Sequence, residues 1–455
     1  MDENVATKRS RTCTSEHESA GKTGGSAERG KAPASGATAR GKAPASGSAA
    51  RGKAPVAGAS RPGGAPRPDS GAPRPGGAEP DRIAYLSHAT ARTALFCLAD
   101  SRPGVERLPD RTTLLSLSAP AVSTQGQAKA LAASGALDFL GPDARPYDLI
   151  VPTAQCRSRG RVANLHVWRD LVQPGSFWRA NERVLVSSPG FVVLQLACAR
   201  RPTALSRELA ARAAQQERRV REQLGLPVHS FTDKDLLDWA NISHLVGAVV
   251  AACEFASTYR PPHPGSAGTT FDRPPLASLE EVGELLGRLP ASSGIMRARR
   301  AVGLAFDGSA SPMETALALI LTLPLDMGGF GLLRPRLNQE IHLPEGFLGL
   351  PGARCVRPDL CWERERVALE YDGDPFHPAA SPEVVSADNE RQNSLTALGY
   401  RVLRVRFPQV ASLRRVTLLA RQLASLLGVP LEDADDLQLI RRQKLILKLT
   451  GPQGG

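Results

Sequence analysis

The chain has 455 residues, 42% of them apolar, and its 57 Lys and Arg against 45 Asp and Glu give a formal net charge of +12. This length allows two or three domains, and the seven cysteines, an odd number without a Cys-x-x-Cys pair, argue against a disulfide framework and a structural zinc site, so we expect a reducing, cytoplasmic location. The polar N-terminus does not resemble a signal peptide and no apolar run reaches the roughly 20 residues of a membrane helix, so we expect no membrane association.

Residues 1–80 form a separate, basic segment. They contain no Leu, Ile, Phe, Tyr or Trp, and 13 Lys or Arg against 7 Asp or Glu place 13 − 7 = +6 of the net charge here. An 11-residue unit that opens Arg-Gly-Lys-Ala-Pro recurs from Arg29, Arg40 and Arg51. Such a segment cannot bury enough apolar surface to order itself, so we expect a disordered tail. It is either a non-specific nucleic-acid arm or a solvated linker.

Residues 81–202 alternate short apolar runs with Pro and Gly, which predicts a mixed α/β unit. We expect strands at 147–151, 161–167 and 183–186, followed by an apolar helix at 191–199. Residues 203–306 have helical periodicity and are predicted to be a helical connector, with a further helix and tail at 431–455. The connector helices are predicted at 204–222, 234–259, 279–289 and 295–306.

Residues 307–430 are predicted to form a second α/β domain. Its first helix has Ser311 as N-cap, Pro312 at the first helical position and Glu314 at the third. The pattern that follows predicts the element order α-β-β-β-α-β-α. The strands are expected at 337–343, 355–362, 367–371 and 400–406, and the later helices at 382–398 and 409–427.

Two carboxylates of this predicted domain are expected to project together. Alternate residues of a strand share one face, so Glu370 and Asp372 project together with Ala368. If Asp359 comes from the preceding strand of a hairpin, a third carboxylate joins them. Negative charges at such a short separation oppose each other's ionisation, and a folded domain rarely tolerates this arrangement without a cation.

Residues 311–428 resemble the PD-(D/E)xK restriction-endonuclease-like superfamily, and more closely the small bacterial domain family related to the very-short-patch-repair endonucleases. That resemblance implies a mixed sheet flanked by helices and a nuclease activity on DNA. The residues that carry it are Glu314 in a Ser-x-x-Glu motif, Pro358-Asp359, Glu370-x-Asp372-Gly373 with His377, Asp388-x-x-Arg391, and Gly399-Tyr400-x-Val402-Leu403-Arg404.

The same resemblance implies the roles of individual residues. Asp359 and Glu370 would hold a divalent cation, Mg²⁺ or Mn²⁺, with Glu314 as a further ligand. Glu314 is alternatively a capping-box residue closing on Ser311. Asp372 is either a further ligand or a turn residue before Gly373. His377 is a candidate general base or phosphate-binding residue, and a solvated loop histidine in the alternative interpretation.

One departure from the family pattern concerns the lysine that usually follows two residues after the second acid. Asp372 occupies that position, and the sequence has no lysine between Lys234 and Lys444. The work of that lysine would fall to His377, Arg391 or Arg404. The very-short-patch-repair branch also lacks this lysine. The candidate DNA-binding residues are Arg391, Gln392 and Arg404.

Residues 83–199 faintly resemble the segment found beside such nuclease-like domains in AbiEi-type antitoxin proteins. His166 and the Val184–Pro189 stretch before an apolar helix carry that resemblance. The resemblance implies a toxin partner protein, although the winged helix-turn-helix of such antitoxins is not evident. The sequence thus predicts a metal-dependent DNA endonuclease or nicking enzyme. The alternative is a catalytically inactive nuclease-fold DNA-binding protein or AbiEi-like antitoxin and transcriptional regulator.

Overall fold

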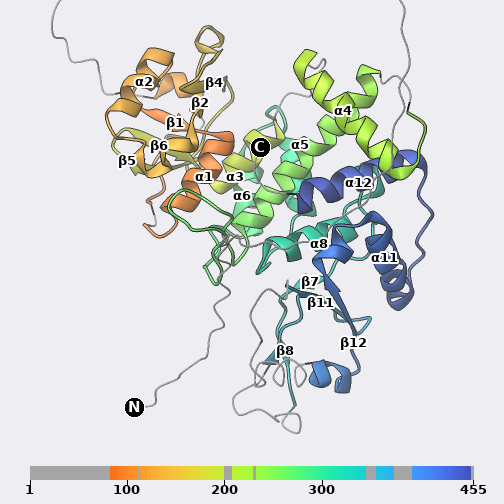
Figure 1. Cartoon of the computed structure of the whole chain (residues 1–455). Helices are drawn as coiled ribbons and strands as arrows, with labels where there is room; N and C mark the ends of the chain where they lie inside the picture. The colour runs from red at the N-terminus through yellow and green to blue at the C-terminus, as the bar shows by residue number, and fades with distance from the viewer. Residues whose placement is uncertain are drawn as a thin grey trace, which may run out of the picture. The chain divides into compact units, whose positions relative to one another are not determined.

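The computed structural model describes residues 82–101, 103–110, 112–117, 119–198, 207–228, 232–344, 355–373 and 392–451. These residues form a mixed α/β structure with two larger mixed sheets, a two-stranded sheet and a set of helices (Figure 1). The predicted α/β class is therefore confirmed. The tail of residues 1–80 lies outside the described residues, so its predicted disorder stays a prediction.

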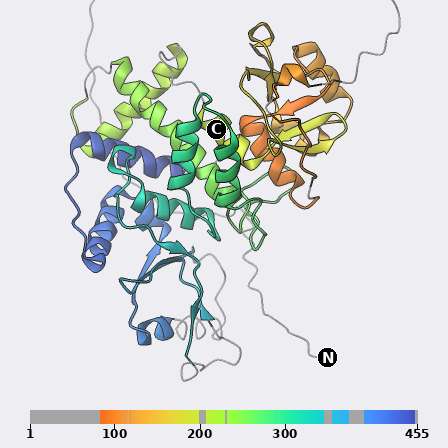
Figure 2. The ribbon, with the colours of Figure 1, turned by 180° about the vertical axis from the view of Figure 1, so that it is seen from behind.

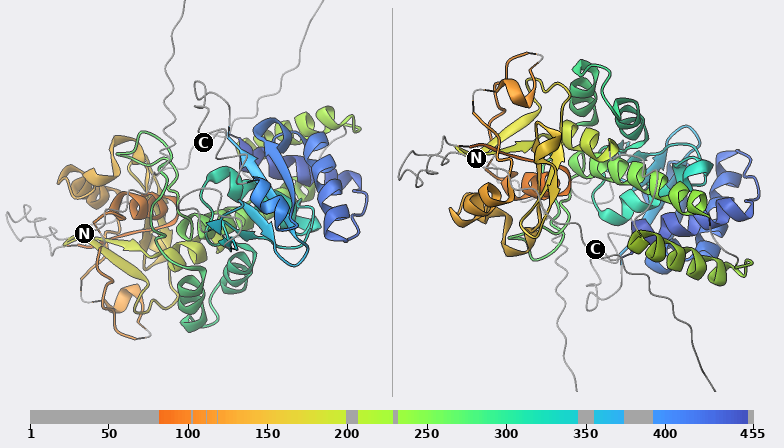
Figure 3. Two further views of the ribbon diagram at one scale, coloured as in Figure 1. Left: turned by 90° about the horizontal axis from the view of Figure 1, so that it is seen from below. Right: turned by 90° about the horizontal axis from the view of Figure 1, so that it is seen from above.

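The orange and yellow strands of Figure 3 form a six-stranded sheet in the order β3-β4-β2-β1-β6-β5. β1 pairs parallel with β6 and β2 parallel with β4, while the other neighbours are antiparallel. The strands predicted at 147–151, 161–167 and 183–186 correspond to β2, β4 and β6 and are confirmed. The six strands are β1 (Ala84–Leu86), β2 (Tyr147–Val151), β3 (Ser158–Arg159), β4 (Ala163–Val167), β5 (Phe177–Asn181) and β6 (Val184–Ser187).

The helices that precede residue 306 include all those predicted from the sequence. The apolar helix expected at 191–199 is α3, whose first turn contains Pro189, a residue pre-set for helical φ. Eight of its nine residues are buried, because it packs between α1, α5, α6 and α7. These helices are α1 (His88–Leu98), α2 (Gln125–Ala133), α3 (Pro189–Ala197), α4 (Arg207–Leu224), α5 (Asp233–Phe255), α6 (Leu279–Arg288) and α7 (Ile295–Leu304).

The helices of the predicted connector contact elements on both sides of it in the sequence. α5 packs on α3, and α4 packs on the last helix, α12 (Asp436–Thr450) (Figure 2). A buried ion pair between Lys444 of α12 and Glu217 of α4 reinforces the second contact. The predicted C-terminal helix is therefore present, and it is packed into the structure rather than standing apart.

Among the described residues, one stretch, Lys234–Phe255 of α5, has the length and hydropathy of a membrane span. Half of it is buried inside the protein, where α5 packs on α3 and α7. A core helix meets the same two criteria, so this stretch is weak evidence in either direction. The expected lack of membrane association stays a prediction.

The C-terminal sheet has the strand order β12-β11-β10-β7, with β11 and β12 parallel and the other neighbours antiparallel. α8 (Pro312–Thr322) precedes it, and residues 392–397 are helical between β11 and β12. The strands predicted at 337–343 and 355–362 are present, but each is divided in two. The strands are β7 (Arg336–Leu337), β8 (Ile341–His342), β9 (Cys355–Val356), β10 (Leu360–Trp362), β11 (Val367–Asp372) and β12 (Arg401–Arg406), with β8 and β9 forming a separate antiparallel pair.

The breaks in the two divided strands lie next to each other in the structure. Asn338 has a φ of 49°, a left-handed conformation that Asn tolerates better than most residues, and it ends β7. On the neighbouring chain segment Pro358, which has no N–H for a ladder, lies between β9 and β10. The Asn338 N–H donates to the carbonyl oxygen of Asp359 at 3.1 Å, so the two breaks are held side by side.

The two faces of β11 pack against different groups of residues. Val367 and Leu369 belong to the main apolar core, whereas Ala368 belongs to a smaller core with Leu395 and Tyr400. This alternation confirms the prediction that Glu370 shares its face with Ala368.

The helix predicted at 409–427 is divided as well. It forms the short α10 (Phe407–Val410) and the longer α11 (Leu413–Leu427), with Ser412 between them. Val416, Leu419 and Leu423 lie on the buried stripe of α11, at the spacing of an amphipathic helix. The opposite face of α11 is therefore exposed.

Candidate functional site

Glu314 lies in the first turn of α8 and is almost wholly buried, with 4% of its surface exposed. The Ser311 hydroxyl caps the helix by accepting the Glu314 N–H at 3.2 Å, as predicted. The carboxylate does not complete a capping box on Ser311. Its Oε2 accepts the Ala310 N–H at 2.8 Å and the Asn338 side-chain amide at 2.6 Å instead. Glu314 is thus held against the break that ends β7.

The environment of Glu314 opposes its ionisation. Burial first, and then the negative charge of Asp359, raise the pKa of Glu314 to about 7, although the hydrogen bonds from Ala310, Asn338 and Ser311 act in the other direction. Without a bound cation, the carboxyl group therefore keeps its proton to a higher pH than an exposed glutamate does.

Asp359 lies at the break before β10, and its carboxylate contacts β11. Its Oδ2 accepts the backbone N–H of Tyr371 at 2.6 Å. Leu360 pairs with Leu369, so extending that register by one residue puts Asp359 across from Glu370. The structure therefore brings two of the predicted metal ligands to adjacent strand positions, with Glu314 near enough to Asp359 for their charges to interact.

Glu370 is buried on the Ala368 face of β11, with 5% of its surface exposed. Its neighbour on the other side, in the parallel register with β12, is Arg404. A buried carboxylate thus has Asp359 on one side and an arginine on the other. Within the part of the chain that the structure describes, no group of three or more His, Cys, Asp and Glu side chains lies close enough together to hold a metal ion.

Asp372 and Arg404 form an ion pair. The guanidinium group donates to Asp372 Oδ1 from Nη2 at 2.6 Å and from Nε at 3.1 Å. Gln392 Oε1 accepts a further, longer bond from Arg404 Nη1 at 3.4 Å, and Arg406 approaches Asp372 Oδ2 at 3.9 Å. Asp372, Gln392 and Arg404 of the predicted site are therefore in one cluster, on the face of the sheet that bears Glu370.

Two predicted site residues cannot be placed. His377 and Arg391 lie outside the described residues, as does Asp388 of the family motif. Their roles stay predictions.

Asn338 is a component of the site that sequence reasoning missed. Its side-chain amide bridges Glu314 Oε2 and the Gly308 carbonyl oxygen at 3.0 Å, while its N–H binds Asp359. The signal in the sequence was an Asn inside a strand candidate, a residue depleted in strands and tolerant of left-handed φ.

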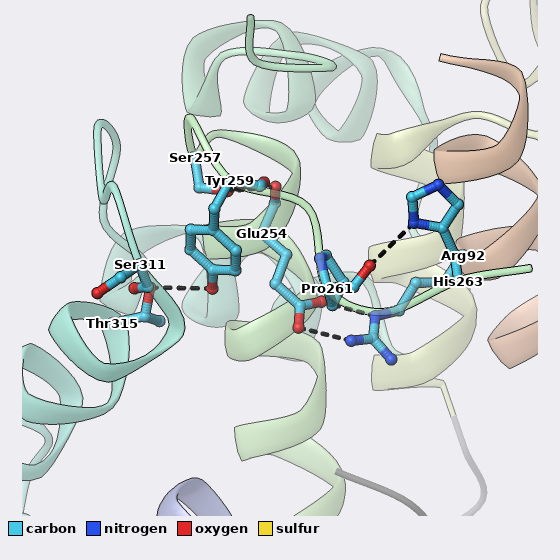
Figure 4. A network of polar contacts seen from close by, with 8 residues as sticks. All are labelled: Arg92, Glu254, Ser257, Tyr259, Pro261, His263, Ser311 and Thr315. Atoms are coloured by element: carbon cyan, nitrogen blue, oxygen red, sulfur yellow. Dashed lines mark hydrogen bonds and ion pairs between the residues drawn. The ribbon is translucent and has the colours of Figure 1, made fainter. Parts of the chain in front are cut away.

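The helix that carries Glu314 is anchored from behind by a polar network (Figure 4). Thr315 of α8 bonds the Tyr259 hydroxyl at 3.1 Å, and its own hydroxyl donates to Ser309 at 2.8 Å. In the same network Arg92 of α1 binds Glu254 of α5 through two bonds, Nε to Oε2 at 2.6 Å and Nη2 to Oε1 at 2.5 Å. The Tyr259 bond therefore ties the first turn of α8 to the segment that follows α5, and the Arg92 bonds tie α1 to α5.

A second polar cluster lies at the N-terminal sheet, around His166. His166 Nε2 bonds Asp148 Oδ1 at 2.8 Å, and its ring stacks on His88 with centroids 4.1 Å apart. Thr90 and Asn164 also bond the Asp148 carboxylate, at 3.4 and 3.3 Å. Burial, and then the charge of His166, lower the pKa of His88 to about 3, against the opposing effect of Asp148. The polar groups of this cluster bond one another, which is typical of a network that stabilises the fold.

Comparisons of the chain with protein-family models, with curated proteins and with solved structures found no match. The interpretation of the site therefore depends on its own geometry and on the sequence motifs.

Proposed function

We propose that this protein is a metal-dependent DNA endonuclease or nicking enzyme of the PD-(D/E)xK, very-short-patch-repair-like type. The observation that carries the proposal is the Glu314 and Asp359 pair, in which the second carboxylate helps to raise the pKa of the first to about 7. Carboxylates that oppose each other's ionisation are typical of sites that bind a cation or move a proton. The proposal is supported by the order of α8, β7 to β11, the helical residues 392–397, β12 and α11, which is the order predicted from the sequence with two of its strands divided.

The donor set suits Mg²⁺ or Mn²⁺. Asp359 and Glu370 would hold the ion from neighbouring strands, with Glu314 assisting from α8. Mg²⁺ is usually bound through one or two carboxylates, waters and substrate phosphates, so a closed cage of protein ligands is not required. When bound, the ion would polarise a phosphodiester and lower the pKa of an attacking water.

The side chains of the site would position the substrate and stabilise the charge of the reacting phosphate. Glu314, whose pKa is about 7 without the ion, would release its proton when the cation binds and would then assist as a carboxylate. Arg404, next to Glu370 in the sheet, would supply the positive charge of the missing lysine, with Asp372 orienting its guanidinium group. His377 as general base, and Arg391 and Gln392 as DNA contacts, belong to the proposal on the sequence alone.

A plasmid-nicking assay tests this function. Full-length protein with Mg²⁺ or Mn²⁺ should convert supercoiled plasmid to nicked circles, and EDTA should prevent it. Glu370→Ala should reduce the rate about 10²-fold or more. The matched control is Glu363→Gln, which removes an exposed acid from the turn of the same hairpin and should nick normally. Equal nicking by Glu370→Ala and the wild type would defeat the assignment.

A second candidate function is a catalytically inactive nuclease fold that binds DNA, as an AbiEi-like antitoxin or regulator with a toxin partner. The ion pair between Asp372 and Arg404 favours it, because the guanidinium group nearest Glu370 is already neutralised by a carboxylate. In that case DNA binding should survive Glu370→Ala and should need no metal, and no nicking should appear with either ion. Loss of all DNA binding by the wild type at low salt would remove both candidates.

A further inference from the structure

A strongly basic segment of the described chain begins beside the candidate site. Residues 400–431 contain six arginines and no Asp, Glu or Lys. Arg404 and Arg421 are neutralised by Asp372 and Asp433, at 2.6 and 2.8 Å. Among the described residues, Arg414 and Arg415 have no ion-pair partner, and both are exposed on α11. Arg414 and Arg415 therefore place positive charge at the N-terminal end of α11.

Part of this positive charge lines a crevice between α10 and α11. It has a volume of about 460 Å³, and Arg406 and Arg415 line it from two different elements. Two glutamines, Gln409 and Gln422, also line it, and none of the described residues around it is acidic. Gln409 Oε1 accepts the Arg406 N–H at 2.9 Å, which leaves the NH₂ group of that amide as a donor. Two like charges and amide donors around one hollow favour an anion.

Arg406 links the crevice to the candidate site. Arg406, which lines it, approaches Asp372 Oδ2 at 3.9 Å, and Asp372 also binds Arg404. Arg404 and Arg406 are two residues apart on one face of β12, a distance of about 6.6 Å along the strand. A phosphate bound by Arg406 would thus lie next to the Asp372 and Arg404 cluster of the candidate site. A polymer with regularly spaced phosphates can place one phosphate in the crevice and another at the proposed reaction centre. An isolated phosphate can occupy only one of these two positions.

We propose that the crevice between α10 and α11 binds a backbone phosphate of the polynucleotide strand whose neighbouring phosphodiester lies at Glu370 and Asp359. Arg406 and Arg415 make the charged contacts, and Gln409 and Gln422 add hydrogen bonds. The contact is to the backbone, so it contributes affinity and register but no sequence preference. This inference rests on the proposed action on DNA, and it assigns the path of the strand across the C-terminal sheet.

The test is equilibrium binding of full-length protein to a fluorescein-labelled 20-base-pair duplex and to its single strand, in EDTA, from 50 to 200 mM NaCl. Arg415→Gln and Arg406→Gln should each weaken binding by roughly 3- to 10-fold at 100 mM NaCl. Each should also flatten the slope of log K against log salt by about 0.7 to 0.9, the loss of one phosphate contact. The matched control is Arg421→Gln, the same charge change on the same helix, at an arginine already paired with Asp433.

Wild-type affinity and slope for Arg415→Gln, or equal losses for Arg415→Gln and Arg421→Gln, would overturn the inference. The first of these results is also the one expected if the crevice docks an acidic protein segment. Because the binding assay contains no metal, its outcome is separate from the plasmid assay. If wild-type protein nicks plasmid and Arg415→Gln nicks it equally well at low DNA concentration, the phosphate subsite is wrong while the nuclease proposal stands. If no nicking occurs but the arginine variants lose affinity selectively, the nuclease proposal is wrong while the phosphate subsite stands.

Discussion

The carboxylate of Asp359 accepts the backbone N–H of Tyr371 at 2.6 Å, beside the last paired residues of β10 and β11. The Asp359 side chain thus adds one hydrogen bond to the ladder between β10 and β11, at the point where the Asp359 backbone carbonyl instead bonds Asn338. As a result, a negative charge is fixed at the start of β10, where it adds to burial in raising the pKa of Glu314.

The first prediction concerns Glu314 and pH. Its pKa is raised in the folded protein from 4.5 to about 7, so its protonated form stabilises the fold fully below pH 4.5 and this contribution is lost as the pH rises through 7. The difference is on the order of 3 kcal/mol. Glu314→Gln should therefore gain stability relative to the wild type between pH 4.5 and 7.5. Thermal unfolding in metal-free buffer across this range measures it, and a constant difference in Tm would contradict the raised pKa.

Asp359→Asn should act on the same titration. The Asn side-chain oxygen can still accept the Tyr371 N–H, but the negative charge that helps to raise the Glu314 pKa is gone. The pKa of Glu314 should fall, while burial keeps it above 4.5. NMR titration of the Glu314 side-chain carboxyl carbon in wild type and variant measures the shift. An unchanged pKa would show that the two carboxylates do not interact.

His88 should give a pH dependence of opposite sign. Its pKa is lowered from 6.5 to about 3, so the neutral imidazole stabilises the fold above pH 6.5, and this contribution is lost as the pH falls from 6.5 towards 3. His88 also has a φ of 50°, which Asn tolerates well. His88→Asn should therefore reduce the fall in Tm between pH 7 and 4.5. His342→Asn, at an exposed position of β8, is the control and should behave as the wild type.

The ion pair between Arg92 and Glu254 should couple α1 to α5 energetically. Glu254 is 4% exposed, so Arg92→Leu leaves a buried carboxylate without its partner and should lower the free energy of unfolding by about 3 kcal/mol. The double variant with Glu254→Leu should recover part of that loss. The contrasting pair is Arg212 and Glu208, which are 73% and 76% exposed, and Glu208→Ala should cost less than about 1 kcal/mol. Denaturant unfolding monitored by circular dichroism separates these outcomes.

Release of Arg404 from its carboxylate should strengthen DNA binding. Asp372→Asn removes the charge that neutralises Arg404, so affinity for a duplex in EDTA should rise several-fold and the salt slope should steepen by about 0.9. Asp326→Asn makes the same change of net charge at an exposed acid paired with Arg300 and should have little effect. Equal gains for both variants would mean that only the net charge matters, and that Arg404 does not contact DNA.

The sequence by itself determined the local elements and the alternation of β11. Apolar periodicity located the helices and strands, and the Ser311 N-cap and the strand period that sets Glu370 beside Ala368 were both confirmed, because these features depend on neighbouring residues only. The tertiary structure decided which distant groups meet. Asn338 reaches Glu314, Asp359 bonds Tyr371, and Arg406 faces Arg415 across a crevice only because the breaks between β7 and β8, β9 and β10, and α10 and α11 bend the chain at those positions. Such contacts depend on long-range packing and register, which local periodicity does not encode.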